Sequence, residues 1–228
     1  MSETFRESRF IDFNQGIVKE SPKDFRTRIP EPWHLKDKVE IFECRVEVWQ
    51  LGVAVEVLKE IETHHPPSIW SHAAYGLISV AFSYFEMIGK SINPKSKTKG
   101  TANLDFNYGF CDVYEEYRPT TSNYDDKNLP EVKEFRDRAR NGMYHLAYTK
   151  RGLGIHNDDS IATKDFYIDD SGAAGIPRVY WVNPHRMVRT MVNHFPTLIA
   201  RLNNPDPNFD VMRKKFKEFF DEFHNPQS

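Results

Sequence analysis

The pattern of apolar and polar residues predicts a chain built mainly from long helices. From Lys36 to about Glu62, apolar side chains recur at steps of three and four residues, which aligns them along one face of a helix. Prolines at 66 and 67 end this stretch, because proline cannot continue a helix. The predicted core-facing stripe consists of Val39, Phe42, Val46, Trp49, Val53 and Val57.

A second helix is predicted from about Ile69 to Ile92, and it is apolar over most of its circumference. Its polar stripe is narrow, which is typical of a helix in the middle of a bundle. The stripe expected to face the core holds Leu77, Ala81, Tyr84 and Ile88, and the opposite stripe holds Ser79, Ser83, Glu86 and Lys90.

Proline, glycine and apolar spacing define the remaining elements. A short helix is expected around 110–117, and a third long helix from Pro130 to about Lys150. Another runs from Pro184 to about Leu202, with a kink or break expected at Pro196. The last helix covers 209–223, and β-prone segments at 165–168 and 178–182 predict a hairpin.

The sequence thus predicts an all-α fold with a small β-hairpin insertion at about 165–182. An N-terminal arm of residues 1–35, with Trp33 packed on the body, precedes one helical domain over 36–228.

Composition and charge narrow the classes of protein. The formal net charge is −2, so any contact with nucleic acid must come from a local patch. The N-terminal residues are charged and lack the apolar stretch of a secretory signal, and no run reaches 18 apolar residues. Cys44 and Cys111 lie in no redox or metal-binding motif, so we expect reduced thiols and a cytoplasmic location, with no membrane contact.

The third long helix carries the residues with the clearest chemistry. At 100° per residue its apolar positions cluster on one side, and Asn141 and His145 lie close to the opposite side. Arg140 lies between the two sides, beside Tyr144. Gly142 removes bulk there, which suits close approach of another helix or a ligand. The core stripe consists of Val132, Phe135, Ala139, Met143 and Leu146.

These residue types suit the handling of a phosphodiester. Arginine offers a permanent planar cation with paired donors for phosphate oxygens. Histidine exchanges a proton near neutral pH, and an asparagine amide can orient a hydroxyl or an imidazole. Because the helix carries no acidic cluster with metal-ligand spacing, we expect neither a metal nor another cofactor. A plain polar helix face with a surface histidine is the alternative interpretation.

The pattern Arg140-Asn141-x-x-x-His145, near the end of a helix in an all-helical bundle, resembles the signature of the HEPN superfamily. The resemblance spans about 36–223 and includes the apolar central helix ending in Glu86-Met87-Ile88-Gly89. It implies a metal-independent endoribonuclease of a defence or toxin-like system. Attack of a ribose 2′-OH on the adjacent phosphate would use His145 as general acid/base, Arg140 as phosphate ligand and Asn141 in support.

The resemblance also implies partners. These are RNA or a nucleotide, a second copy paired through the motif helix, and a protein regulator. Some HEPN relatives only bind nucleotides or act as scaffolds, so a non-catalytic dimer is the alternative function.

Other residues are weaker candidates. Possible substrate-binding residues are Tyr144, Tyr148, Lys150, Arg151 and Glu86, although the helix-end cations and a Glu86–Lys90 pair also have plain structural explanations. A zinc site at His64, His65 and His72 is disfavoured by their spacing. Tyr180 and Trp181 could stack on bases, but packing of the hairpin is the stronger expectation. We expect His185, Arg189 and His194 to be surface residues.

Overall fold

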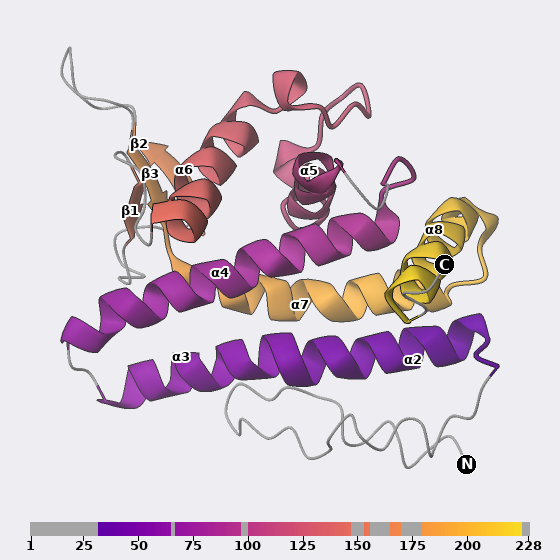
Figure 1. Cartoon of the computed structure of the whole chain (residues 1–228), viewed down its shortest axis with the longest axis horizontal. Helices are drawn as coiled ribbons and strands as arrows, with labels where there is room; N and C mark the ends of the chain where they lie inside the picture. Colours follow the sequence, from indigo (N-terminus) through magenta and orange to yellow (C-terminus); the bar gives the residue numbers. More distant parts are fainter. Residues whose placement is uncertain are drawn as a thin grey trace.

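The computed structural model describes residues 32–64, 67–96, 100–146, 153–155, 165–169 and 179–224, and it is mostly helical, as expected. Its elements are arranged around one long helix, α4 (Figure 1). The α-helices are α2 (Leu35–Arg45), α3 (Gly52–His64), α4 (Pro67–Ile92), α5 (Ala102–Val113), α6 (Pro130–Leu146), α7 (Pro184–Asn203) and α8 (Asp210–His224). Single turns of 3-10 helix lie at Glu115–Tyr117, Asp126–Asn128 and Pro207–Phe209.

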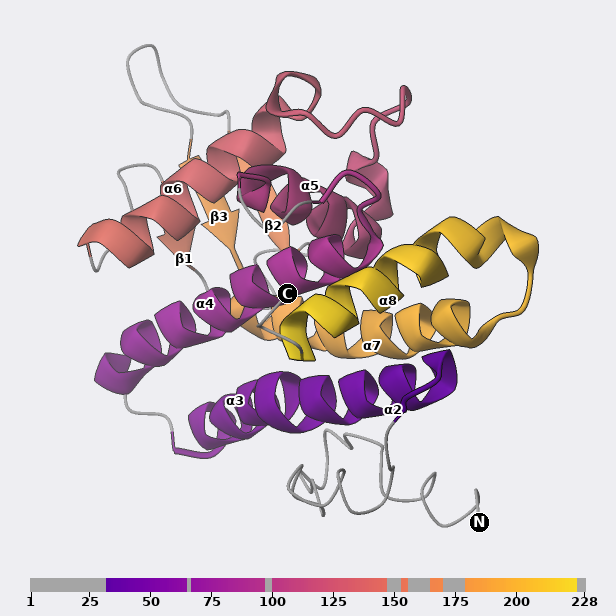
Figure 2. The same ribbon diagram turned by 45° about the vertical axis from the view of Figure 1, so that its right-hand side comes forward.

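Helix α4 occupies the centre of the bundle, between α2–α3 and α7 on one side and α5 and α6 on the other (Figures 1 and 2). The predicted apolar stripe is buried along its whole length, from Leu77 to Ile88. Ser83 and Lys90 on the opposite stripe are exposed, and Ser79 and Glu86 are half-buried. The prediction of a central helix with a narrow polar stripe is therefore confirmed.

Helices α4 and α5 approach so closely that each needs a glycine at the crossing. A Cβ added to Gly89 would lie 1.6 Å from the carbonyl oxygen of Asp105. A Cβ added to Gly109 would lie 1.8 Å from the carbonyl oxygen of Phe85. Because the two contacts are reciprocal, any side chain at either position would force the helices apart.

The first helical stretch contains a feature that the sequence pattern did not predict. A π-helical turn, Val46–Leu51, joins α2 to α3, and it holds one residue more per turn than an α-helix. Beyond the π-turn the buried residues are Leu51, Ala54, Val55, Leu58 and Ile61, whereas Trp49 is 69% and Val53 50% exposed. The predicted stripe is correct up to Val46 and wrong at Trp49 and Val53, since one extra residue rotates the following helix by about 100°. Val57, the last residue of the predicted stripe, is half-buried against the core.

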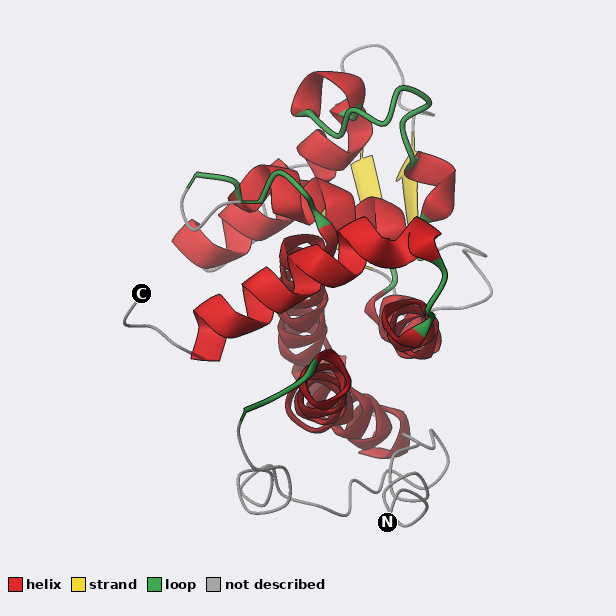
Figure 3. Cartoon of the chain, turned by 90° about the vertical axis from the view of Figure 1, so that its right-hand side faces the viewer, coloured by secondary structure: helices red, strands yellow, loops and turns green. Residues whose placement is uncertain are grey.

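The small β element is larger than predicted. Strands β2 (Phe166–Asp169) and β3 (Val179–Val182) match the two expected segments and pair antiparallel, with Phe166 opposite Val182. A third strand, β1 (Leu153–Ile155), pairs parallel with β3, giving the order β1-β3-β2 (Figure 2). Figure 3 shows strands in yellow among the helices in red. The sheet packs beside α6 (Figure 1).

Two other expectations need correction, and one is confirmed. Helix α5 begins at Ala102 rather than near 110, because its polar residues Asp105 and Asn107 are buried and hydrogen-bonded. Helix α7 continues through Pro196 without a break, since that residue is exposed and the carbonyl it leaves unbonded can face water. Trp33 packs edge-on against Phe220 of α8, with ring centroids 5.8 Å apart, as expected for the end of the arm. Residues 1–31 of the arm lie outside the described residues.

Candidate active site on helix α6

Helix α6 is anchored on the bundle by the predicted apolar stripe. Val132, Phe135 and Ala139 are each at most 1% exposed. The Phe135 ring lies 5.2 Å from Phe82 of α4 and 4.5 Å from Phe166 of β2, measured between centroids. The stripe therefore holds α6 between the helical bundle and the sheet; the side chains of Met143 and Leu146 lie outside the described residues.

A buried arginine adds a second anchor that the sequence analysis missed. Arg136 is 1% exposed, and its guanidinium donates to the Asn107 side chain at 2.8 Å and to both carboxylate oxygens of Asp126 at 3.0 and 2.9 Å. These bonds hold the pKa of Asp126 below its ordinary value, against the effect of burial. On a helical wheel Arg136 lies within about 40° of Val132, so its place in the buried stripe was the signal available in the sequence.

The side of α6 opposite the apolar stripe is partly covered by the sheet. The Tyr180 hydroxyl of β3 donates to the Glu134 carboxylate at 2.6 Å, and the Arg138 guanidinium lies 5.0 Å from the Tyr180 ring centroid. Arg138 also donates to Glu134 one turn away. Tyr180 is fully buried, so the packing interpretation of this residue is confirmed.

The three predicted catalytic residues lie in the C-terminal half of α6. Arg140, Asn141 and His145 all belong to its continuous helical backbone, but their side chains lie outside the described residues. By helical register, Asn141 and His145 continue the row that begins with Glu134 and Arg138. The catalytic assignments therefore remain predictions.

The register also sets the angle between the two key positions. Arg140 and His145 are five residues apart, which places the two positions about 140° apart around the helix axis. Arg140 follows Arg136 by one turn, whereas His145 follows the row that contacts the sheet. A single copy of α6 thus presents the arginine and histidine positions to different sides.

The weaker candidates are spread over several parts of the chain. Tyr144 belongs to α6, but its side chain is outside the description, and Tyr148, Lys150 and Arg151 lie wholly outside it. Glu86 is half-buried on α4. The side chains of His64, His65 and His72 are not described either.

The structure reveals a second polar cluster, centred on Asp112 of α5. Its carboxylate accepts two bonds from Arg201 at 2.8 and 2.5 Å, one from Arg118 at 3.1 Å and one from the Nε2 of His194 at 3.1 Å. The Nδ1 of His194 lies 2.9 Å from the hydroxyl of Tyr84 on α4. The expectation that His194 is a surface residue is wrong, because these partners enclose its side chain, which is 9% exposed.

Burial and charge act in opposite directions on this cluster. Burial alone would raise the pKa of Asp112, but the hydrogen bonds and charges of Arg201 and His194 outweigh it and hold that pKa well below its ordinary value. Burial raises the pKa of Tyr84 well above 10. All four acceptor positions of the carboxylate are used, so we assign the cluster a structural role in tying α4, α5 and α7 together.

His185 is also buried, at 7% exposure, whereas Arg189 is exposed as expected. His185 lies at the start of α7, where the Asn183 side chain caps the helix by accepting from the backbone N–H groups of His185 and Arg186. The surface prediction for His185 is therefore wrong.

Both cysteines are free thiols. Burial raises the pKa of Cys111 to about 12, which makes it a poor nucleophile.

Within the described ranges, no group of three or more His, Cys, Asp or Glu side chains is arranged to hold a metal ion. None of the helices in those ranges has the length and hydropathy needed to cross a bilayer.

Comparison with known proteins gives no family. The chain matches no protein-family model, no curated protein and no solved structure. The resemblance to HEPN proteins therefore depends on the motif and on the order of the helices alone.

Proposed function

We propose that the chain is a metal-independent endoribonuclease of the HEPN type, acting in a defence or toxin-like system. The observation that carries the proposal is the position of the Arg140-Asn141-x-x-x-His145 motif on a helix whose other side is fixed in the core. A rigid scaffold of this kind is what a preorganised catalytic site requires. Arg136 and the pair Glu134–Tyr180 supply that rigidity about two and a half to three turns before His145.

In the proposed reaction the 2′-oxygen of a ribose attacks the adjacent phosphorus and displaces the 5′-oxygen of the next nucleotide. His145 accepts the proton of the 2′-OH, and a protonated histidine returns a proton to the leaving 5′-oxygen. Arg140 holds the phosphate oxygens through paired N–H donors, and Asn141 orients the imidazole or the attacking hydroxyl. The products are a 2′,3′-cyclic phosphate and a 5′-hydroxyl.

The helical register supports a site built from two copies of α6. Because positions 140 and 145 lie about 140° apart around the helix axis, a single helix places them on different sides. Two motif helices facing each other would let an arginine from either copy approach a histidine in one cleft. We therefore propose a homodimer through α6, with RNA bound between the two copies.

The test is RNA cleavage by the purified protein in EDTA, with the cyclic phosphate detected on the product. We expect His145→Ala and Arg140→Ala each to lower the cleavage rate by about 10²–10⁴-fold, the usual contribution of a positioned acid–base or charged group. Lys133→Ala is the matched control, because Lys133 lies on the same helix with its side chain 49% exposed and ion-paired to Asp137, one turn away. Circular dichroism checks that each variant is folded.

Two results would contradict the proposal. Cleavage that survives both substitutions would place the catalytic residues elsewhere. Absence of cleavage together with retained binding of RNA or a nucleotide would favour the non-catalytic dimer, with which the near-neutral net charge of −2 is also compatible.

A further inference from the structure

The face of the sheet that points away from α6 carries a tryptophan that the proposed mechanism does not use. On β3, Tyr180 and Val182 are fully buried, and Tyr180 contacts α6. Trp181 lies between them and therefore on the opposite face, because successive strand residues alternate between the two faces. Strand pairing places Gly154 of β1 and Tyr167 of β2 opposite Trp181. We call the face that carries Trp181 the outer face of the sheet.

The Trp181 ring lies flat on Gly154. A Cβ added to Gly154 would lie 2.4, 2.5 and 2.9 Å from three consecutive carbons of the six-membered ring, Cε3, Cζ3 and Cδ2. These distances place the added Cβ over the face of the ring, since an approach in the ring plane would leave Cδ2 much farther away than the other two atoms. Side chains on a strand usually stand upright from the sheet, so a ring that lies across the neighbouring strand needs the space that a glycine leaves.

A ring in this position has one face on the backbone of β1 and the other directed away from the sheet. Trp181 is half-buried, so part of its surface stays accessible. Nucleobases stack on aromatic rings, and such stacking is a main source of affinity for single-stranded nucleic acid. Stacking needs no positive charge, which suits a chain whose formal net charge is −2.

We propose that the Trp181 ring stacks on a base of the RNA substrate. The inference rests on the proposed ribonuclease function and extends the RNA-binding surface beyond the motif helix. Figure 2 shows α6 crossing one face of the three-stranded sheet, and the Trp181 ring lies on the other face. A single strand of RNA that passes round the edge of the sheet contacts both the motif helix and the ring.

The experiment measures binding of a fluorescently labelled 2′-O-methyl RNA oligonucleotide to the full chain in EDTA. The methyl group blocks the proposed attack by the 2′-OH, so binding is measured without cleavage. We expect Trp181→Leu to raise the Kd by about tenfold or more, since leucine still covers Gly154 but offers no flat face to a base. The same factor is expected at low and high salt, because stacking involves no ion pair. Trp181→Phe should raise the Kd by less.

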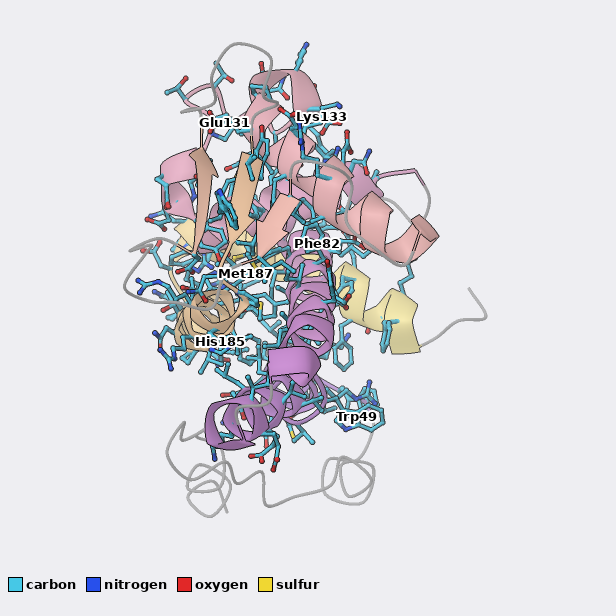
Figure 4. All side chains as sticks on the ribbon, turned by 90° about the vertical axis from the view of Figure 1, so that its left-hand side faces the viewer. Trp49, Phe82, Glu131, Lys133, His185 and Met187 are labelled. Carbon is cyan, nitrogen blue, oxygen red and sulfur yellow. The ribbon has the colours of Figure 1, made fainter. Side chains whose placement is uncertain are left out.

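Trp49→Leu is the matched control. Trp49 is 69% exposed and lies well away from the strands in Figure 4. The same substitution there should leave the Kd unchanged. Circular dichroism checks that each variant is folded.

A second measurement uses the unaltered chain. An oligonucleotide that contains 5-iodouridine forms a covalent adduct with an aromatic side chain stacked on that base when it is irradiated. Mass spectrometry should then locate an adduct at Trp181. This result is expected whether or not Trp181→Leu folds.

Three results would overturn the proposal: a Kd for folded Trp181→Leu equal to that of wild type, no adduct at Trp181, or a single nucleotide that binds as tightly as the oligonucleotide. The last would assign the ring to a free nucleotide instead of RNA. These results are distinct from failure of the ribonuclease. RNA binding that depends on Trp181 without any cleavage would support the stacking site alone, whereas cleavage with an unchanged Kd in Trp181→Leu would remove the stacking site alone.

Discussion

Two glycines of the central helix α4 have very different surroundings. Gly89 and Gly76 both lie in α4, and both cost helix stability relative to alanine. At Gly89 the neighbouring backbone of α5 occupies the place of a side chain, whereas at Gly76 nothing lies within 4 Å of an added Cβ. The same substitution should therefore have opposite effects at the two positions.

We expect Gly89→Ala to lower the free energy of unfolding by about 3 kcal/mol or more, since neither backbone can yield without separating the helices. Gly76→Ala should raise it by up to about 1 kcal/mol through the better helix propensity of alanine. Urea denaturation of both variants measures the difference. Equal stability of the two variants would show that α4 and α5 do not cross as closely as described.

At the scale of elements, the π-turn decides which side of α3 faces the core. Val53 and Val55 offer a matched pair, because the same change can be made two residues apart. In an uninterrupted helix Val53 would be buried, but it is 50% exposed and Val55 is 1% exposed.

Val55→Ala should therefore cost about 2 kcal/mol of unfolding free energy, from two lost buried methyl groups and the cavity they leave. Val53→Ala should change it by no more than about 0.5 kcal/mol. Chemical denaturation of the two variants side by side provides the measurement. The reverse order of costs would indicate a continuous α-helix through residues 46–51.

Apolar spacing alone predicted the helical stripes in which buried side chains recur every three or four residues. The stripe of α4 and the first half of the α6 stripe lie where the pattern placed them. The π-turn could not be predicted this way, because Val53 and Val55 are both apolar and only packing selects between them. Strand β1 was missed because it is three residues long and its partner, β3, lies about 25 residues further along the chain.

The buried polar residues were harder to predict than the apolar ones. Asp112 binds Arg201, 89 positions away, so nothing near either residue in the sequence reveals the pair. Arg136 was more accessible to sequence reasoning, because it falls inside the apolar stripe of its own helix. The catalytic motif was found from chemistry and resemblance, and no side-chain geometry bears on it.

At the scale of the whole molecule, the Asp112 cluster connects helices that are distant in sequence. Because the pKa of the Asp112 carboxyl is depressed, the cluster's contribution to the free energy of unfolding depends on pH. An unfolded aspartate takes up a proton near pH 3.9, whereas the folded one resists protonation to lower pH. The contribution is therefore complete above about pH 5 and is lost as the pH falls through and below 4.

Asp112→Asn tests this at neutral and acid pH. At pH 7 we expect a loss of about 3 kcal/mol in unfolding free energy, because Arg201 loses its charged partner in a largely buried setting. The difference from wild type should shrink as the pH falls from 5 towards 2. Glu115→Gln, at a side chain that is 74% exposed, is the control with little expected effect. Parallel pH profiles for wild type and Asp112→Asn would contradict the assignment.

The strand order β1-β3-β2 has a consequence for how the protein is made. The central strand is the last of the three to leave the ribosome, so neither β1 nor β2 has its neighbour until Val182 has been synthesised. The Tyr180 contact to Glu134 forms no earlier, which leaves the motif helix without its sheet-side support from the synthesis of Leu146 until that of β3. A nascent chain that stalls before β3 therefore carries the whole Arg-Asn-His motif but not the sheet that steadies it.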